Sequence, residues 1–196
     1  MSAFHIASVS RILVGAIAVL CSSCGTIPSA DQPQSYLDQS TAATVTLVGR
    51  PLVFARERPN FAVHMRDYIT LAAASIDRAG KIQLVLIAYF WTTFDPHARD
   101  DVAHPDELTI VADDRRITLA KLNRTAHEAG IEERVNAPAV GSGPPVLYSA
   151  DLATLRFIAA SRSLSAHTRT GDTELDYSVW EDRRAALSQW VHDQSD

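Results

Sequence analysis

Cysteine is almost absent from this sequence of 196 residues, and both cysteines, Cys21 and Cys24, stand close to its start. No thiol follows residue 24, so a disulfide framework is excluded for the rest of the chain. A tetrahedral zinc site built from thiolates is excluded for the same reason. The folded part of the protein must therefore be stabilised by its hydrophobic core, which 46% apolar residues can supply.

A surplus of basic residues is also missing. The sequence has 18 Lys and Arg residues against 23 Asp and Glu residues, which gives a formal net charge of -5 at pH 7. Proteins that bind nucleic acid neutralise phosphates with an excess of cations, and no such excess exists here. The charge balance therefore predicts no nucleic-acid partner.

Sequence motifs of known chemistry are missing as well. The chain has no GxSxG nucleophile elbow, no HExxH zinc motif, no Gly-punctuated calcium loop and no glycine-rich phosphate or dinucleotide loop. Serine, histidine and aspartate can be combined in many ways in a chain with seven histidines, so such combinations alone indicate nothing. We interpret His64 and His167 as structural residues. No cofactor is predicted, and the sequence names no reaction.

The apolar segment at residues 12–20, ILVGAIAVL, is too short to cross a bilayer as a helix. It has less than half of the roughly 20 apolar residues that a transmembrane helix needs. It follows Arg11 and precedes the small residues Ser22 and Ser23, which is the order of regions in a secretory signal peptide. The start of the chain therefore predicts export from the cytoplasm.

The segment CSSC, residues 21–24, resembles the lipobox of bacterial lipoproteins, in which small residues precede a cysteine that becomes diacylated and starts the mature protein. Cys24 fits that role, since Ser22 and Ser23 occupy the small positions, whereas Cys21 would need Leu20 there. Two alternatives stay open: ordinary signal cleavage without a lipid, and a CxxC redox or metal site. The resemblance, of the kind seen in proteobacterial lipoproteins, covers the N-terminal signal region only. The globular part resembles no functional family.

The resemblance implies that residues 1–23 are a signal peptide and that Cys24 carries acyl chains such as palmitate. Gly25 follows, and in lipoproteins of enteric bacteria the absence of Asp at this position implies transfer to the outer membrane, facing the periplasm. Residues 24–40, rich in Ser, Pro, Gln and Asp, are predicted to be a polar tether to a single domain at 41–196. The predicted partners are the membrane, through the lipid, and another envelope protein.

Alternating apolar and polar residues predict strands through most of this domain. Three hairpins are predicted: residues 67–76 with 82–94 around Ala79-Gly80, residues 108–120 around Asp113-Asp114, and residues 164–169 with 174–180 around the turn TGD. Further strands are predicted at 41–49 and 52–55, and short helices at 151–160, capped by Ser149 or Asp151, and after Glu181 or Asp182. The predicted fold class is α+β or mainly β, an antiparallel sheet or β-sandwich with one or two short C-terminal helices.

The strand at residues 82–91 is apolar on both of its faces. A strand with this pattern is typical of the middle of a sheet that is covered on both sides. The alternative is a segment that dips into a membrane or pairs with itself, because a run of β-prone residues aggregates when exposed. We predict the covered strand.

The densest polar cluster is the segment at residues 94–107, FDPHARDDVAHPDE. Its histidines His97 and His104, with Asp95, are candidate ligands for zinc or calcium, which prefer imidazole nitrogen or carboxylate oxygen. The spacing matches no metal motif, and an exposed polar loop explains the same residues. They are therefore weak candidates for a metal site.

Arginine and tryptophan give two further candidate surfaces. Arg50, Arg56 and Arg58 have guanidinium groups suited to phosphate or to anionic lipid head groups, or they are charges that protect an edge strand. The tryptophans can line a ligand groove, although their places in the predicted elements favour positions that close the core. They are Trp91, Trp180 and Trp190.

Three functions are therefore compatible with the sequence. The first is a non-enzymatic, lipid-anchored envelope module that contacts another envelope component. The second is a carrier of a small ligand or lipid, with a cavity of a few hundred cubic ångströms between the sheet and the C-terminal helix. The third is a metal-dependent hydrolase that uses the 94–107 segment. We predict the first, because it requires only the anchor and the tether.

Overall fold

The computed structural model describes residues 31–58, 65–93, 104–131, 136–138 and 142–194. The described chain is mainly β, as predicted, with two short helices in its C-terminal third. Its elements are β1 (Gln34–Asp38), β2 (Ala43–Leu47), β3 (Leu52–Glu57), β4 (Arg66–Arg78), β5 (Lys81–Thr92), β6 (Glu107–Ala112), β7 (Arg115–Leu119), the 3-10 helix η1 (His127–Ala129), β8 (Val146–Ser149), α1 (Leu152–Ala160), β9 (Leu164–Thr170), β10 (Thr173–Glu181) and α2 (Arg184–Asp193).

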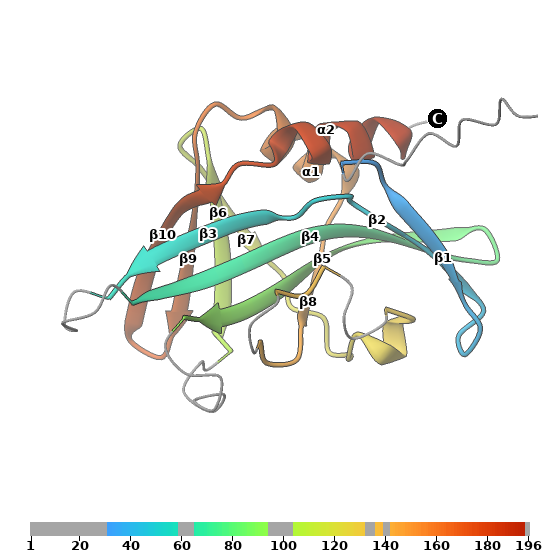
Figure 1. The fold of residues 1–196 in the computed structure, drawn as a ribbon, viewed down its shortest axis with the longest axis horizontal. Helices are drawn as coiled ribbons and strands as arrows, with labels where there is room; N and C mark the ends of the chain where they lie inside the picture. The colour runs from blue at the N-terminus through green and yellow to red at the C-terminus, as the bar shows by residue number, and fades with distance from the viewer. Residues whose placement is uncertain (1–30, 59–64, 94–103, 132–135, 139–141, 195–196) are drawn as a thin grey trace, which may run out of the picture.

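The ten strands form one antiparallel sheet (Figure 1). Its main path runs β1-β2-β4-β3-β10-β9-β6-β7, with β5 on the other edge of β4 and β8 beside β5. Strand β4 is long enough for β2 and β3 to pair with different parts of the same edge. The three predicted hairpins, β4–β5, β6–β7 and β9–β10, are confirmed.

The sheet also closes on itself. The chain that continues from β7 pairs with β8 through a bridge between Lys121 and Tyr148. Two backbone hydrogen bonds support this bridge: Leu122 N–H donates to the carbonyl of Leu147 at 2.8 Å, and Ser149 N–H donates to the carbonyl of Ala120 at 2.8 Å. As a result β3, β4, β5, β8, β7, β6, β9 and β10 form a continuous hydrogen-bonded circuit, and the β1–β2 hairpin extends from it.

Strand β5 is covered on both faces, as its sequence predicts. On one face Leu86 lines a small apolar space together with Leu155 of α1 and Leu187 of α2, and Figure 1 shows these two helices lying over the sheet. On the other face Val85 and Ile87 are fully buried in the same cluster as Ala126, Ala129 and Ile131, around η1. The apolar run at residues 82–91 is thus mostly core, and only its first residues are exposed.

The first helix begins as predicted and the second begins later. Asp151 is the N-cap of α1, and its carboxylate accepts a hydrogen bond from Thr154 N–H at 2.7 Å. Helix α2 begins at Arg184 rather than after Glu181, because β10 continues to pair with β3 through Glu181. Asp182 then accepts a hydrogen bond from Arg184 N–H at 3.1 Å, close to the start of the helix.

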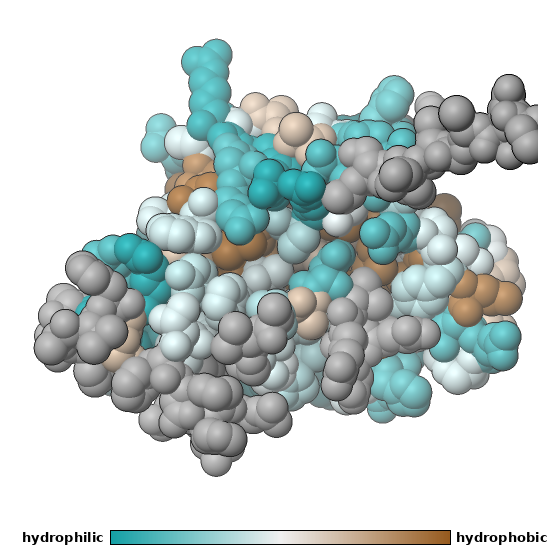
Figure 2. Space-filling view, in the orientation of Figure 1, coloured by the Kyte–Doolittle hydropathy of each residue, from teal (hydrophilic) through white to brown (hydrophobic). Residues whose placement is uncertain are grey.

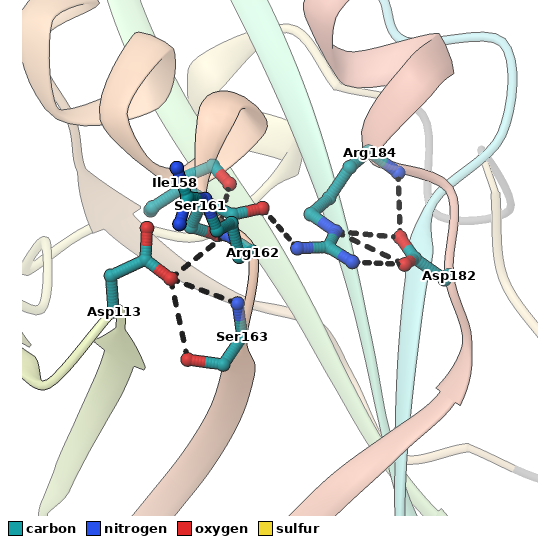
Figure 3. Close-up of polar contacts among 7 residues, drawn as sticks. All are labelled: Asp113, Ile158, Ser161, Arg162, Ser163, Asp182 and Arg184. Atoms are coloured by element: carbon teal, nitrogen blue, oxygen red, sulfur yellow. Dashed lines mark hydrogen bonds and ion pairs between the residues drawn. The ribbon is translucent and has the colours of Figure 1, made fainter.

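Polar contacts connect the β6–β7 turn to both helices (Figure 3). One carboxylate oxygen of Asp113 accepts hydrogen bonds from the backbone N–H groups of Arg162, at 2.8 Å, and Ser163, at 2.9 Å. These bonds lower the pKa of Asp113, the backbone bond from Ser163 most. Arg184 at the start of α2 donates to the carbonyl of Ser161, the residue that ends α1, and is paired with Asp182. The helices are therefore attached to the sheet by hydrogen bonds as well as by apolar packing.

The sheet starts earlier than the sequence pattern predicts. Residues Gln34–Asp38, which fall in the predicted tether, form β1 and pair with β2. The tether prediction was wrong for these residues because β1 has no buried apolar face to reveal it. Its side chains are exposed or half-buried, and Tyr36 is fixed by a hydrogen bond from its hydroxyl to the carbonyl of Gly130 at 3.2 Å.

Candidate functional site

The candidate site is a shallow groove of about 430 Å³ where β3, β4, β9 and β10 lie side by side. Nine residues line it: Ala55, Arg56, Glu57, Arg66, Ser165, Asp176, Tyr177, Ser178 and Trp180. They come from four strands, which the pairing of β3 with β4 and of β10 with both β3 and β9 brings together. Most of these side chains are polar or aromatic, and the groove is open to solvent.

A chain of three polar side chains lies at this groove. Ser165 and His167 are two residues apart on β9 and share a face, and Asp176 of β10 lies directly opposite His167. The hydroxyl of Ser165 is 3.2 Å from His167 Nε2, and His167 Nδ1 is 2.5 Å from Asp176 Oδ1. The order serine, imidazole, carboxylate is the order of groups in a nucleophilic triad.

The surroundings of Ser165 do not complete such a triad. Strand β9 lies between β6 and β10, and Ser165 is paired with Val111 on one side and Ser178 on the other. Backbone N–H groups around Ser165 are therefore used by the sheet ladders, whereas an acyl-transfer site needs N–H groups free to stabilise an oxyanion. The Asp176 side chain is 78% exposed, so its charge is screened by water.

His167 also belongs to a group that has the composition of a metal site. The ligand atoms of His167, Glu174 and Asp176 lie within 4.8 Å of one another. Glu174 is bound to Arg116 at 3.0 Å, and Asp176 is bound to His167. Both carboxylates are exposed and already have partners, so the geometry alone assigns no metal here. This group was not predicted from the sequence, because His167 was interpreted as a structural residue.

An exposed tryptophan forms one wall of the groove. Trp180 is 51% exposed, with the Arg66 guanidinium 4.6 Å from its ring centroid. Tyr68 meets it edge to face at 6.1 Å and is itself stacked on Trp91 at 4.1 Å. Only Trp190 is fully buried, so the prediction that the tryptophans close the core holds for Trp190 and is wrong for Trp180. Strand alternation directs Trp180 outward, to the face of Ser178 and Asp176.

The predicted arginines Arg50, Arg56 and Arg58 all form ion pairs with aspartates. Asp67, only 6% exposed, accepts a hydrogen bond from Arg56 at 2.5 Å and two from Arg58 Nε at 2.8 and 2.9 Å. Arg50 pairs with Asp31 at 3.1 Å. The edge-strand interpretation was wrong, because β3 lies between β4 and β10. The guanidinium groups of Arg56 and Arg58 instead neutralise one buried carboxylate.

Of the three predicted metal ligands, His104 lies in the described part of the chain. His97 and Asp95 lie outside the described residues. His104 packs edge to face against Phe90 at 6.1 Å, and its buried Nδ1 has no hydrogen-bond partner. Burial, followed by the charge of Lys121, lowers the pKa of His104. Within the described part of the chain, the group that could hold a metal is the one around His167, and it does not include His104.

The space between the sheet and the helices is nearly filled. A cavity of about 10 Å³ lies there, lined by apolar residues of β3, β4, β5, α1 and α2 together with Val48 and Arg50. This volume is close to that of a single water molecule by the same measure. The space predicted for a small-ligand or lipid carrier is therefore not present at this position.

Comparison with models of known protein families, with curated proteins and with solved structures found no match. None of the helices in the described residues has the length and apolar character needed to span a membrane. Function is therefore inferred from the groove and from the N-terminal sequence.

Proposed function

We propose that this protein is a lipid-anchored module of the cell envelope that binds another envelope component through its groove and catalyses no reaction. The N-terminal signal and Cys24 would attach it to the outer membrane, facing the periplasm. The observation that supports binding is the exposed Trp180, flanked by Arg66 and backed by Tyr68. Tryptophan, tyrosine and arginine are enriched at the centres of protein interfaces, where their truncation is most costly.

The charges around the groove favour recognition of a polar partner. Arg66 is bound to Glu57 at 2.7 Å, and the Asp176 carboxylate lines the same groove, so a cation and two anions are presented together. Such an arrangement adds specificity more than affinity, because a partner must present the complementary pattern. The groove is open and most of its lining side chains are polar or charged, whereas small-molecule sites are mostly apolar, so the lining favours a protein partner.

Truncating Trp180 to alanine is expected to reduce partner capture at least tenfold, because a central aromatic anchor contributes about 2 kcal/mol or more. The measurement is affinity capture from solubilised envelope with immobilised lipoprotein, followed by quantitative mass spectrometry. Thr173→Ala, an exposed position on the same hairpin, is the matched control and should leave capture unchanged. Equal capture by the wild-type and Trp180→Ala proteins, or no specific capture by either, contradicts the proposal.

The Ser165–His167–Asp176 chain supports a second candidate, a serine hydrolase. A fluorophosphonate probe, which reacts only with activated serines, separates the two candidates. We expect no labelling of the wild-type protein, because Ser165 lacks nearby oxyanion donors. Stoichiometric labelling that disappears in Ser165→Ala would establish the hydrolase and end the non-catalytic proposal.

A further inference from the structure

Two exposed apolar side chains lie in one row at one end of the sheet. The large exposed apolar residues of the described chain are Leu37, Ile82 and Trp180, and the first two are 64% and 65% exposed. Leu37 is paired with Thr44, Thr44 with Asp77, and Asp77 with Ile82, so both apolar residues stand in one row across four strands. Residues in such a row share a face of the sheet. Figure 2 shows hydrophobic and hydrophilic atoms side by side at this end of the molecule.

Cations lie on the opposite face of the same hairpin, because Arg78 and Lys81 are each one residue away from the row. Lys81 and Arg78 are paired on either side of the β4–β5 turn, and Arg124 lies beside them, where its guanidinium donates to Gln83 Oε1 at 2.6 Å. The Nε atoms of Arg78 and Arg124 are buried and have no hydrogen-bond partner. Burial and the charge of Arg78 both lower the pKa of Arg124, so two cations are held close together here.

The carboxylates at this end accept hydrogen bonds from neighbouring groups. Asp77 accepts from Gly80 N–H at 2.8 Å, and Asp38 binds the hydroxyl groups of Ser40 and Thr41. Glu128 accepts from Thr125 N–H at 2.7 Å. Three cations offset these three anions, so this end is close to neutral in a chain whose formal charge is -5. It is therefore not repelled by an anionic surface as the rest of the protein is.

We propose that this end, which we name the hairpin end and define by Leu37, Ile82 and the β4–β5 turn, rests in the phospholipid head-group layer of the membrane that carries the lipid anchor. The inference depends on the proposed function, since it takes acylated Cys24 as the attachment point. Ile82 and Leu37 would enter the acyl boundary, while the long, exposed side chain of Lys81 reaches back to phosphate groups.

The length of chain after the anchor permits this contact. Six residues lie between Cys24 and Asp31, and the extended chain from one to the other spans about 24 Å. Asp31 is bound to Arg50, next to the point where Val48 pairs with Ala73. From Ala73 the strand reaches its turn in about 20 Å, at 3.4 Å per residue. The tether is therefore long enough for the hairpin end to touch the bilayer, and short enough to keep it nearby.

A probe at position 82 tests the contact. The mature lipoprotein would carry Cys24 in acylated form, so Ile82→Cys introduces the single reactive thiol. This variant is labelled with an environment-sensitive fluorophore and reconstituted into vesicles of phosphatidylethanolamine and phosphatidylglycerol with brominated acyl chains. Asp172→Cys is the matched control, because the β9–β10 turn is exposed and lies beyond the opposite end of the sheet.

We expect a blue-shifted emission and at least threefold stronger quenching at position 82 than at position 172. The mass of the same sample reports whether Cys24 is acylated. Equal quenching at both positions in acylated protein overturns the membrane contact and leaves the anchor intact. A mass without acyl chains overturns the proposed function, and the membrane contact with it.

Discussion

Replacing Cys24 by alanine is expected to abolish incorporation of labelled palmitate and to move the protein from the membrane fraction to the soluble fraction. Each buried methylene adds about 0.8 kcal/mol to membrane attachment, so two or three acyl chains hold a protein almost irreversibly. Without them the only apolar segment near the start is residues 12–20, which is too short to replace a lipid anchor. The effect should therefore be close to all or none.

Cys21→Ala is the matched control for this experiment, because it removes the other thiol and leaves Ser22 and Ser23 before Cys24. The control should retain both the label and the membrane location. Palmitate that persists in Cys24→Ala but disappears in Cys21→Ala would place the anchor at Cys21 and contradict its assignment to Cys24. Membrane fractionation that is unchanged in both variants, with no label in the wild-type protein, would remove the lipid anchor altogether.

Truncating Trp190 to alanine is expected to reduce the free energy of unfolding by about 3–5 kcal/mol, the usual range for a fully buried large aromatic residue. Trp190 is 0% exposed, and its indole Nε1–H donates to the carbonyl of Thr46 at 3.4 Å. It belongs to the buried face of α2 that packs on the sheet, together with Leu187 and Val191. Its removal leaves a cavity between α2 and β2, which the surrounding backbone can fill only in part.

The measurement is urea unfolding of the wild-type protein and of two variants. Trp190→Phe keeps most of the ring and should lose clearly less stability than Trp190→Ala. Gln189→Ala is the control, since Gln189 is exposed on the opposite face of the same helix and should change stability by less than about 0.5 kcal/mol. A loss below about 1 kcal/mol for Trp190→Ala would contradict the packing of α2 on the sheet.

Most of the fold could be predicted from local sequence patterns. The turn at Asp113-Asp114 could be predicted because apolar alternation flanks two aspartates. Aspartate tolerates the positive φ that both residues adopt in this turn. The cap of α1 was visible because Asp151 precedes an apolar helical pattern. Each of these signals lies within a few neighbouring residues, so a single sequence contains it in full.

The groove depended on information that a single sequence does not hold. Alternation along each strand was sufficient to predict that Ser165 and His167 share a face of β9 and that Asp176, Ser178 and Trp180 share a face of β10. The register that sets Asp176 opposite His167, and the pairing of β10 with β3, join segments far apart in the chain. The same limit hid the closure of the sheet through Lys121 and Tyr148.

That closure has a consequence for how the protein reaches its folded state. Ala55 on β3 and Ser178 on β10 are 123 positions apart, yet they are neighbours in the circuit. Folding therefore has a high contact order, and such chains fold in milliseconds to seconds because distant segments must meet first. If the chain is exported as proposed, its N-terminus emerges first, and β5 stays without β8 until the C-terminal half has crossed the membrane. During that interval the apolar residues of β5 would be available to other chains, and a holding chaperone would protect the nascent protein.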